Sequence, residues 1–162
     1  MNVKKITLFF VFLIITTSLN FGQCPDNLNV QLVTQAQVDE FGELYPNCTT
    51  LNHLTIGTND DEFSDITHLS GLQSLKQLFG GLFVIKTNFL KDLSGLDSLS
   101  QASFLSIEQN DSLMNLSGLE QLGPNEFNEF GGISIIGNPM LIDISQLSNI
   151  SVALFDVLQV QN

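Results

Sequence analysis

The sequence contains no tryptophan and no arginine, and its 162 residues include only two histidines, two cysteines and one tyrosine. Five lysines face 17 acidic residues, which gives a formal net charge of -12 at pH 7. Nucleic acids and anionic membranes are therefore poor partners, because both are bound through a basic surface. The acidic surface favours solubility and a cationic or calcium-bridged partner.

Residues 1–22 have the composition of a secretory signal peptide. Two lysines stand near the start, and the apolar run Ile6–Ile15 is shorter than the roughly 20 residues that a membrane-spanning helix needs. We expect cleavage after Gly22, export of the remaining chain to the cell surface or beyond, and no membrane insertion afterwards. An uncleaved anchor and a lipid on Cys24 are the alternatives.

The two cysteines, Cys24 and Cys48, both lie at the start of the exported part. An even pair in an exported chain predicts a disulfide, and closing a loop of about 25 residues contributes roughly 3 kcal/mol. A metal site is the alternative, although two cysteines without nearby histidine make a poor ligand set.

Residues 34–45, between the cysteines, predict an amphipathic helix. Thr34 is a suitable N-cap, and Val38 and Phe41 fall on one face at helical spacing. Together with the disulfide, this helix is expected to make residues 23–50 a cap over the apolar end of the domain that follows.

Residues 51–162 repeat the pattern apolar-x-apolar-x-x-Asn, and each Asn is followed by a leucine-rich corner, which is Ser-Gly in the first three repeats and Ser-Gln in the fourth. The pattern occurs as Leu54/Ile56/Asn59, Phe83/Ile85/Asn88, Leu105/Ile107/Asn110 and Ile133/Ile135/Asn138. The corners lie 24, 23 and 28 residues apart. Repeats of this length are typical of solenoids, in which each coil buries its apolar face on the next. We therefore predict four to five coils with one parallel sheet, in which each apolar pair points inward.

Glycine and asparagine have predicted structural roles in the turns of these repeats. Gly80-Gly81 and Gly131-Gly132 are expected to supply the positive φ angles of sharp corners. The asparagines are expected to form a turn ladder that bonds backbone groups beyond the reach of the sheet, and a ligand site is the alternative. The predicted ladder consists of Asn59, Asn88, Asn110 and Asn138.

The N-terminal elements and the repeat together resemble the receptor L domain, a right-handed β-helical, leucine-rich-repeat-like module, in its exported bacterial members. The residues that carry the resemblance are Cys24-Pro25, the following helix, Cys48, Leu54–Ile56, Leu69–Leu72 and Leu82–Ile85. The resemblance implies a disulfide between Cys24 and Cys48, a capping helix, and a binding or adhesive role without catalysis. The chain departs from the pattern at two corners, where Asn52-His53 replaces Gly-Gly and Gln146 replaces glycine.

Residues for catalysis or metal binding are sparse. The histidines, His53 and His68, lack a marked nucleophile beside them. Asn59–Glu62 with Asp65 offers oxygen ligands, but the spacing lacks the alternating pattern of a calcium loop. We predict no catalytic, cofactor-binding or metal residues.

The predicted protein is a single exported solenoid domain that recognises a protein or glycan through its sheet face or its acidic loops. The alternatives are a calcium-dependent, polysaccharide-acting β-helix and a structural spacer in a larger surface protein. Because the sequence stops at a predicted strand exit, we expect it to be a fragment or to be completed by another segment.

Overall fold

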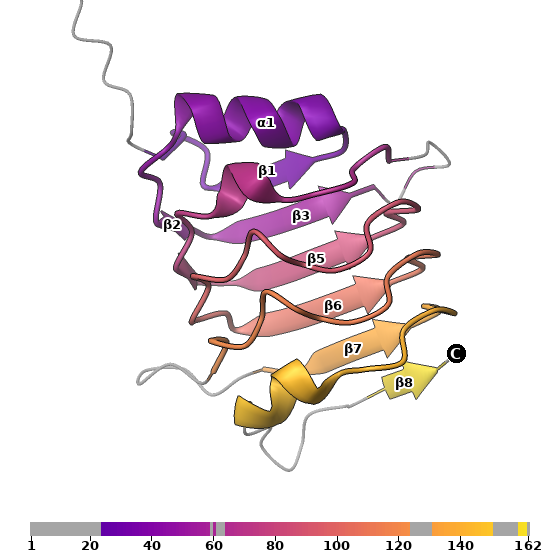
Figure 1. Cartoon of the computed structure of the whole chain (residues 1–162). Helices are drawn as coiled ribbons and strands as arrows, with labels where there is room; N and C mark the ends of the chain where they lie inside the picture. The colour runs from indigo at the N-terminus through magenta and orange to yellow at the C-terminus, as the bar shows by residue number, and fades with distance from the viewer. Residues whose placement is uncertain (1–23, 59, 61–63, 124–130, 151–158, 162) are drawn as a thin grey trace, which may run out of the picture.

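The computed structural model describes residues 24–58, 60, 64–123, 131–150 and 159–161 (Figure 1). The predicted signal peptide and Asn59 lie outside these residues. The elements in chain order are β1 (Asn29–Leu32), α1 (Gln35–Leu44), β2 (Thr50–Leu51), β3 (His53–Gly57), the 3-10 helix η1 (Ser70–Leu72), β4 (Gln77–Leu78), β5 (Gly81–Ile85), β6 (Phe104–Glu108), β7 (Ile133–Ile136), the 3-10 helix η2 (Ser145–Asn149) and β8 (Gln159–Gln161).

The strands form two parallel sheets. The larger sheet has six strands in the order β1-β3-β5-β6-β7-β8, and β2 pairs with β4 in the smaller one. Figure 1 shows α1 at one end of the large sheet, beside β1, and β8 at the other end. The predicted parallel sheet is therefore confirmed. Among the described residues, no helix has the length and apolar character needed to cross a bilayer.

Successive repeats also bond to one another outside the large sheet. The Lys76 N–H donates to the carbonyl oxygen of Thr49 at 2.8 Å, and the Ser100 N–H donates to that of Lys76 at 2.9 Å. The Gly123 N–H continues the series by donating to the carbonyl oxygen of Ser100 at 3.1 Å. These bonds satisfy backbone groups of the connecting segments, which would otherwise need water.

Aliphatic side chains from neighbouring strands align in rows and form the core. One row comprises, from β3 to β7, Leu54, Leu82, Leu105 and Ile133. The next row comprises Ile56, Val84, Ile107 and Ile135. Each of these side chains is at most 3% exposed. Burying one such side chain contributes about 1.5–3 kcal/mol relative to leaving it in water, so these rows are a main source of stability.

The predicted register of the pair Phe83/Ile85 is wrong by one residue, although Ile85 itself is buried, at 6% exposure. Leu82 and Val84 occupy the core rows, both at 0% exposure, while Phe83 is half-buried on the opposite face of β5. Residues 82–85 are all apolar, so period-two alternation does not distinguish the two faces. Pairing with β3 and β6, whose alternation is clear, fixes the register, and a shift of one residue exchanges the faces.

The predicted helix is present as α1, with Thr34 as its N-cap. The Thr34 hydroxyl accepts from the Gln37 N–H, and the Gln37 side chain accepts from the Thr34 N–H, which completes a capping box. Val38 and Phe41 are its buried residues. The disulfide between Cys24 and Cys48 is also present, so that prediction is confirmed and neither sulfur is a free metal ligand.

Two contacts that the sequence did not predict hold α1 against η1. The Gln35 side-chain oxygen accepts from the backbone N–H groups of Thr67 and His68, at 2.8 and 3.1 Å. Glycines allow the two backbones to touch, because a Cβ on Gly71 would lie 2.0 Å from the carbonyl oxygen of Val38. The helix therefore packs directly on the first repeat.

Candidate functional site

Three aromatic rings from adjacent strands lie together on the face of the large sheet opposite the core rows. They are His53 at the start of β3, Phe83 in β5 and Phe104 at the start of β6, and we call them the aromatic face. The ring centroids are 6.1 Å apart between His53 and Phe83, and 6.0 Å apart between Phe83 and Phe104. His53 is exposed and both phenylalanines are half-buried, so the rings pack on one another and still reach solvent.

Two glycines make room for these rings. A Cβ on Gly80 would lie 2.1 Å from Cε1 of His53, and a Cβ on Gly81 would lie 2.7 Å from Cε2 of Phe83. Neither glycine has a positive φ, so the predicted reason for this Gly-Gly pair is wrong. In the other predicted corner, Gly132 does have a positive φ, of 145°. At Gly80 and Gly81 the absence of a side chain lets the rings lie against the backbone.

A hydrogen bond fixes the orientation of the His53 ring. The Gly81 N–H donates to Nδ1 of His53 at 3.0 Å. In the neutral imidazole the proton therefore resides on Nε2, which becomes a hydrogen-bond donor beside the phenylalanine rings. The aromatic face thus combines apolar ring surface with one directional polar group.

Hydroxyl groups and one carboxylate continue the same sheet face beyond the rings. Parallel pairing aligns Phe83 with Thr55 on one side and with Ser106 on the other, and Ser106 with Ser134. The Ser106 hydroxyl donates to the carboxylate of Glu108, two residues along the same strand, and Ser106 is only 3% exposed, so it supports the face from below. The half-buried Thr55 and Ser134 are the hydroxyls that can reach a ligand beside the rings, and none of these groups forms a nucleophile–base pair.

The asparagines of the predicted ladder differ in their surroundings. Asn110 and Asn138 are 0% and 1% exposed, and the Asn110 side-chain N–H donates to the side-chain oxygen of Asn138 at 2.9 Å. The Asn110 side-chain oxygen accepts from the N–H and the hydroxyl of Thr87, at 2.9 and 2.7 Å. Buried and bonded in this way, Asn110 and Asn138 join the turns of successive repeats and are out of reach of a ligand.

Thr87 occupies the position that the pattern gave to Asn88. The register that aligns Leu82 with Leu105 also aligns Thr87 with Asn110, and Thr87 is 0% exposed whereas Asn88 is half-buried. The shift has the same origin as that of Phe83, namely an apolar run without alternation. Asn59 lies outside the described residues.

His68 forms polar contacts at the other end of the first repeat. Its Nδ1 lies 2.9 Å from the Ser70 hydroxyl and 3.3 Å from the side-chain nitrogen of Gln35. The Asp65 carboxylate instead accepts from the Gln35 N–H at 2.7 Å. These exposed side chains fasten α1 to the first repeat, and the contacts contain no third group that orients the histidine as a base.

Metal ligands do not gather in the described ranges. No group of three or more His, Cys, Asp or Glu side chains there is placed to hold a metal ion. Most of the acidic stretch 59–62, which was weighed as a calcium site, lies outside those ranges.

Sequence analysis did not select the aromatic face as a site, although it contained a signal. Asn52-His53 stands where two other repeats have Gly-Gly, and this departure places the His53 ring over Gly80. Departures from a repeat pattern are expected where function competes with regularity. Comparisons of the chain with protein-family models, with curated proteins and with solved structures found no match.

Proposed function

We propose that this chain is an exported, non-catalytic recognition module of solenoid architecture, related to the receptor L domain, that binds a protein or glycan through the aromatic face. The single observation that carries the binding proposal is the cluster of solvent-reaching rings of His53, Phe83 and Phe104 on a parallel sheet. Aromatic side chains are enriched at binding surfaces, because they offer large contact area with few rotatable bonds.

Repetition supports the solenoid part of the proposal. Rows of aliphatic side chains run from strand to strand, and the connecting segments bond to one another at the same interval. Such nearest-neighbour stacking is the defining property of solenoids. Among solenoids, the N-terminal helix and the disulfide favour the receptor L domain, which is a right-handed β-helix.

The disulfide supports export of the chain. Disulfides persist in oxidising compartments and are rare in the cytosol. The Cys24–Cys48 bond closes the segment that contains α1, next to the first repeat. An extracellular or cell-surface location agrees with this bond.

The chemistry of the face favours a neutral or basic ligand. The chain carries a net charge of -12, and Glu108 lies on the same sheet face as the rings. Sugar rings present C–H groups to aromatic faces and hydroxyls to polar neighbours, and basic peptides present cations to the rings. An anionic ligand would meet repulsion from the whole molecule.

The test compares Phe83→Ala and Phe89→Ala in the disulfide-bonded chain. Phe89 is 55% exposed in the turn after β5, away from the aromatic face, so it is a control of equal chemistry. Probing glycan and protein arrays should find a ligand whose affinity falls about 30-fold or more in the Phe83 variant and stays unchanged in the control, as for a hot-spot residue.

Two results would overturn this proposal. The first is equal loss of binding in both variants, which would mean that exposed phenylalanine acts without specificity. The second is an array without any ligand, which would favour the structural spacer. The remaining alternative is a calcium-dependent, polysaccharide-acting β-helix. Such a protein would bind calcium before its substrate, so calorimetric titration with calcium would detect heat of binding.

A further inference from the structure

The outermost strand of the large sheet, β1, has a free edge beside helix α1. Among the described residues β1 pairs with β3 on one side and with no strand on the other. Figure 1 shows α1 running alongside β1 at this end of the sheet. A groove of about 250 Å³ lies between the two elements and is lined by residues of both. It involves none of the rings of the aromatic face, and the inference drawn from it does not rest on the proposed function.

Alternate backbone groups of β1 point away from the rest of the sheet. The carbonyl oxygen of Leu28 accepts from the His53 N–H at 3.3 Å, which sets the alternation of the parallel ladder between β1 and β3. Even-numbered residues of β1 therefore bond to β3, whereas the N–H and C=O groups of Asn29 and Gln31 point away from it. Both of these residues are exposed, so their outward backbone groups reach solvent.

The two ends of this edge are closed by nearby side chains, and its middle is open. The Asn29 N–H donates to Oδ1 of Asn27 at 3.1 Å, and the Val33 N–H donates to Oε1 of Gln37 at 2.6 Å. Between them, the C=O of Asn29 and the N–H and C=O of Gln31 have no partner within the described part of the chain. Such groups are a template for another extended segment, and this stretch matches about three residues of an added strand.

Helix α1 leaves this edge open because it packs on the other side of the first repeat. A Cβ on Gly42 would lie 2.6 Å from Cα of Gly71, so the backbones of α1 and η1 touch. Toward β1 the helix presents side chains to the groove instead. Leu44 is 41% exposed, and the half-buried Tyr45 ring lies 5.2 Å from that of the buried Phe41. An apolar side chain of an added strand would pack here and remove this surface from water.

Glu40 gives the groove a preference for positive charge. It lines the groove one helical turn before Leu44. The helix also carries Asp39 and Glu43, and it contains no basic residue. Four residues of a helix rise about 6 Å, and two residues of a strand span about 6.6 Å. A lysine or arginine two residues from the apolar side chain therefore reaches Glu40, since side chains two apart in a strand share a face.

We propose that an extended, basic peptide segment of a partner protein adds to the free edge of β1. Its backbone pairs with Asn29 and Gln31, an apolar side chain packs against Leu44 and Tyr45, and a basic side chain two residues away faces Glu40. This is recognition by strand addition, in which main-chain bonds give affinity and alternate side chains give specificity. A second copy of the chain is a poorer occupant, because its net charge of -12 would meet the carboxylates of α1.

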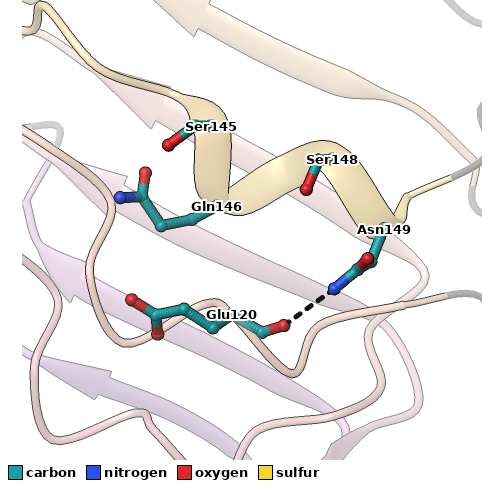
Figure 2. Close-up of a pocket in the computed structure, with 5 residues that line it drawn as sticks. All are labelled: Glu120, Ser145, Gln146, Ser148 and Asn149. Atoms are coloured by element: carbon teal, nitrogen blue, oxygen red, sulfur yellow. Dashed lines mark hydrogen bonds between the residues drawn. The ribbon is translucent and has the colours of Figure 1, made fainter.

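A second cleft, between the turn at Glu120 and η2, lacks these features (Figure 2). Its lining residues are all polar and none belongs to a strand: Glu120, Ser145, Gln146, Ser148 and Asn149. The side-chain nitrogen of Asn149 already donates to the Glu120 carbonyl oxygen at 3.1 Å. Without an apolar side chain or a strand edge this cleft does not select an extended peptide, so the groove beside β1 is the more specific surface.

Two pairs of matched variants test the proposal. Gln31→Pro removes the open N–H, which lies outside the ladder with β3, and edge strands accept proline where the N–H faces solvent. Gln31→Ala is its control, because it loses the side chain with its bond to the Gly57 carbonyl oxygen and keeps the N–H. Glu40→Lys reverses the charge in the groove. Glu43→Lys makes the same change at an exposed position of α1 outside the groove.

The experiment is an NMR titration of the intact, disulfide-bonded chain with the acetylated, amidated peptide Thr-Lys-Thr-Leu-Thr. We expect saturable shifts of the amide signals of residues 29–33 and 37–45, with a dissociation constant in the millimolar range or below. Gln31→Pro should weaken binding about tenfold or more, and Gln31→Ala should stay within about threefold of the unchanged chain. Glu40→Lys should weaken it about fivefold, and Glu43→Lys about twofold or less.

N-methylated peptides test backbone pairing on the unchanged chain. Only alternate N–H groups of an added strand face β1. Methylating one set, either the lysine and leucine or the threonines, should therefore abolish binding, whereas methylating the other set should keep it within about fivefold. Loss with both sets or with neither would overturn the proposal, as would equal binding by the two Gln31 variants.

The position of the shifts distinguishes this surface from others. Shifts confined to β3, β5 and β6 would place the peptide on the aromatic face, which refutes strand addition and leaves the proposed function standing. Shifts of residues 29–33 when the chain alone is concentrated would identify a second copy as the occupant and refute the peptide proposal. Absence of any shift at millimolar peptide also refutes it and leaves the aromatic face untouched.

Discussion

Replacing Asn110 by alanine should destabilise the protein more than any exposed asparagine substitution. Asn110 is 0% exposed, and its side chain bonds to Thr87, to Asn138 and, at 3.0 Å, to the carbonyl oxygen of Val84. Alanine removes both halves of the amide and leaves these groups buried without partners. The side chain links three repeats, so no neighbouring group replaces it.

The magnitude follows from the groups that lose their partners. Each buried donor or acceptor left unsatisfied costs about 1–3 kcal/mol, and the Thr87 N–H and the Val84 carbonyl oxygen are two such groups. The Thr87 hydroxyl and the Asn138 side-chain oxygen are partly relieved, because the hydroxyl rotates and the oxygen keeps its bond to the Asn110 N–H. We therefore expect Asn110→Ala to lower the free energy of unfolding by about 3–5 kcal/mol.

Urea unfolding of the disulfide-bonded chain, followed by circular dichroism, measures this loss. The control is Asn88→Ala, because the repeat pattern treats Asn88 and Asn110 as equivalent whereas the structure aligns Thr87 with Asn110. Asn88 is half-buried and shows no side-chain hydrogen bond within the described residues, so its loss should stay below about 1 kcal/mol. Equal losses in the two variants would refute both the register and the account of the buried amides.

Three further predictions concern backbone strain, protonation and the disulfide. Gly118→Ala should lower the free energy of unfolding in urea by well over about 2 kcal/mol, because its Cβ would lie 2.1 Å from the carbonyl oxygen of Leu93. Gly137→Ala, at φ of 68° but with its nearest atom at 3.4 Å, should lower it by about 1 kcal/mol. Equal losses in the two variants would contradict the close contact. Hydrogen bonds from Ser145, first from its backbone N–H and then from its side chain, lower the pKa of Asp143 below 3.8. The ionised Asp143 therefore contributes stability above that pH, and this contribution is lost as the pH falls through the lowered pKa. An NMR titration that finds an ordinary pKa for Asp143 would contradict this. Replacing Cys24 and Cys48 by alanine should lower the thermal midpoint through a loss of roughly 3 kcal/mol, and an unchanged midpoint would show that the bond adds nothing to the folded domain.

Local sequence signals were sufficient for the N-terminal elements. The capping box at Thr34 and the spacing of Val38 and Phe41 involve residues within two helical turns, so their chemistry is visible in the sequence. The cysteine pair left a single possible bond. By contrast, the contacts of Gln35 and the touching backbones at Gly71 join segments more than 25 residues apart, and no local pattern contains them.

The candidate site depended on contacts between repeats. His53, Phe83 and Phe104 are separated by 30 and 21 residues in the chain, and only parallel pairing of β3, β5 and β6 brings their rings to within about 6 Å. Glycine is needed at positions 80 and 81 because a Cβ there would collide with the His53 and Phe83 rings. The sequence rule that assigns corner glycines to positive φ angles does not predict this reason.

The sequence by itself determined the period of the repeat, the parallel sheet and the inward pairs of three of its strands, since spacing and alternation are properties of one chain segment at a time. Tertiary structure alone decided which face the unbroken apolar run 82–85 turns toward the core, and which of two adjacent residues completes the buried hydrogen bonds. The physical reason is that each of these outcomes is set by the neighbouring repeat, whose position is fixed only when the strands pair.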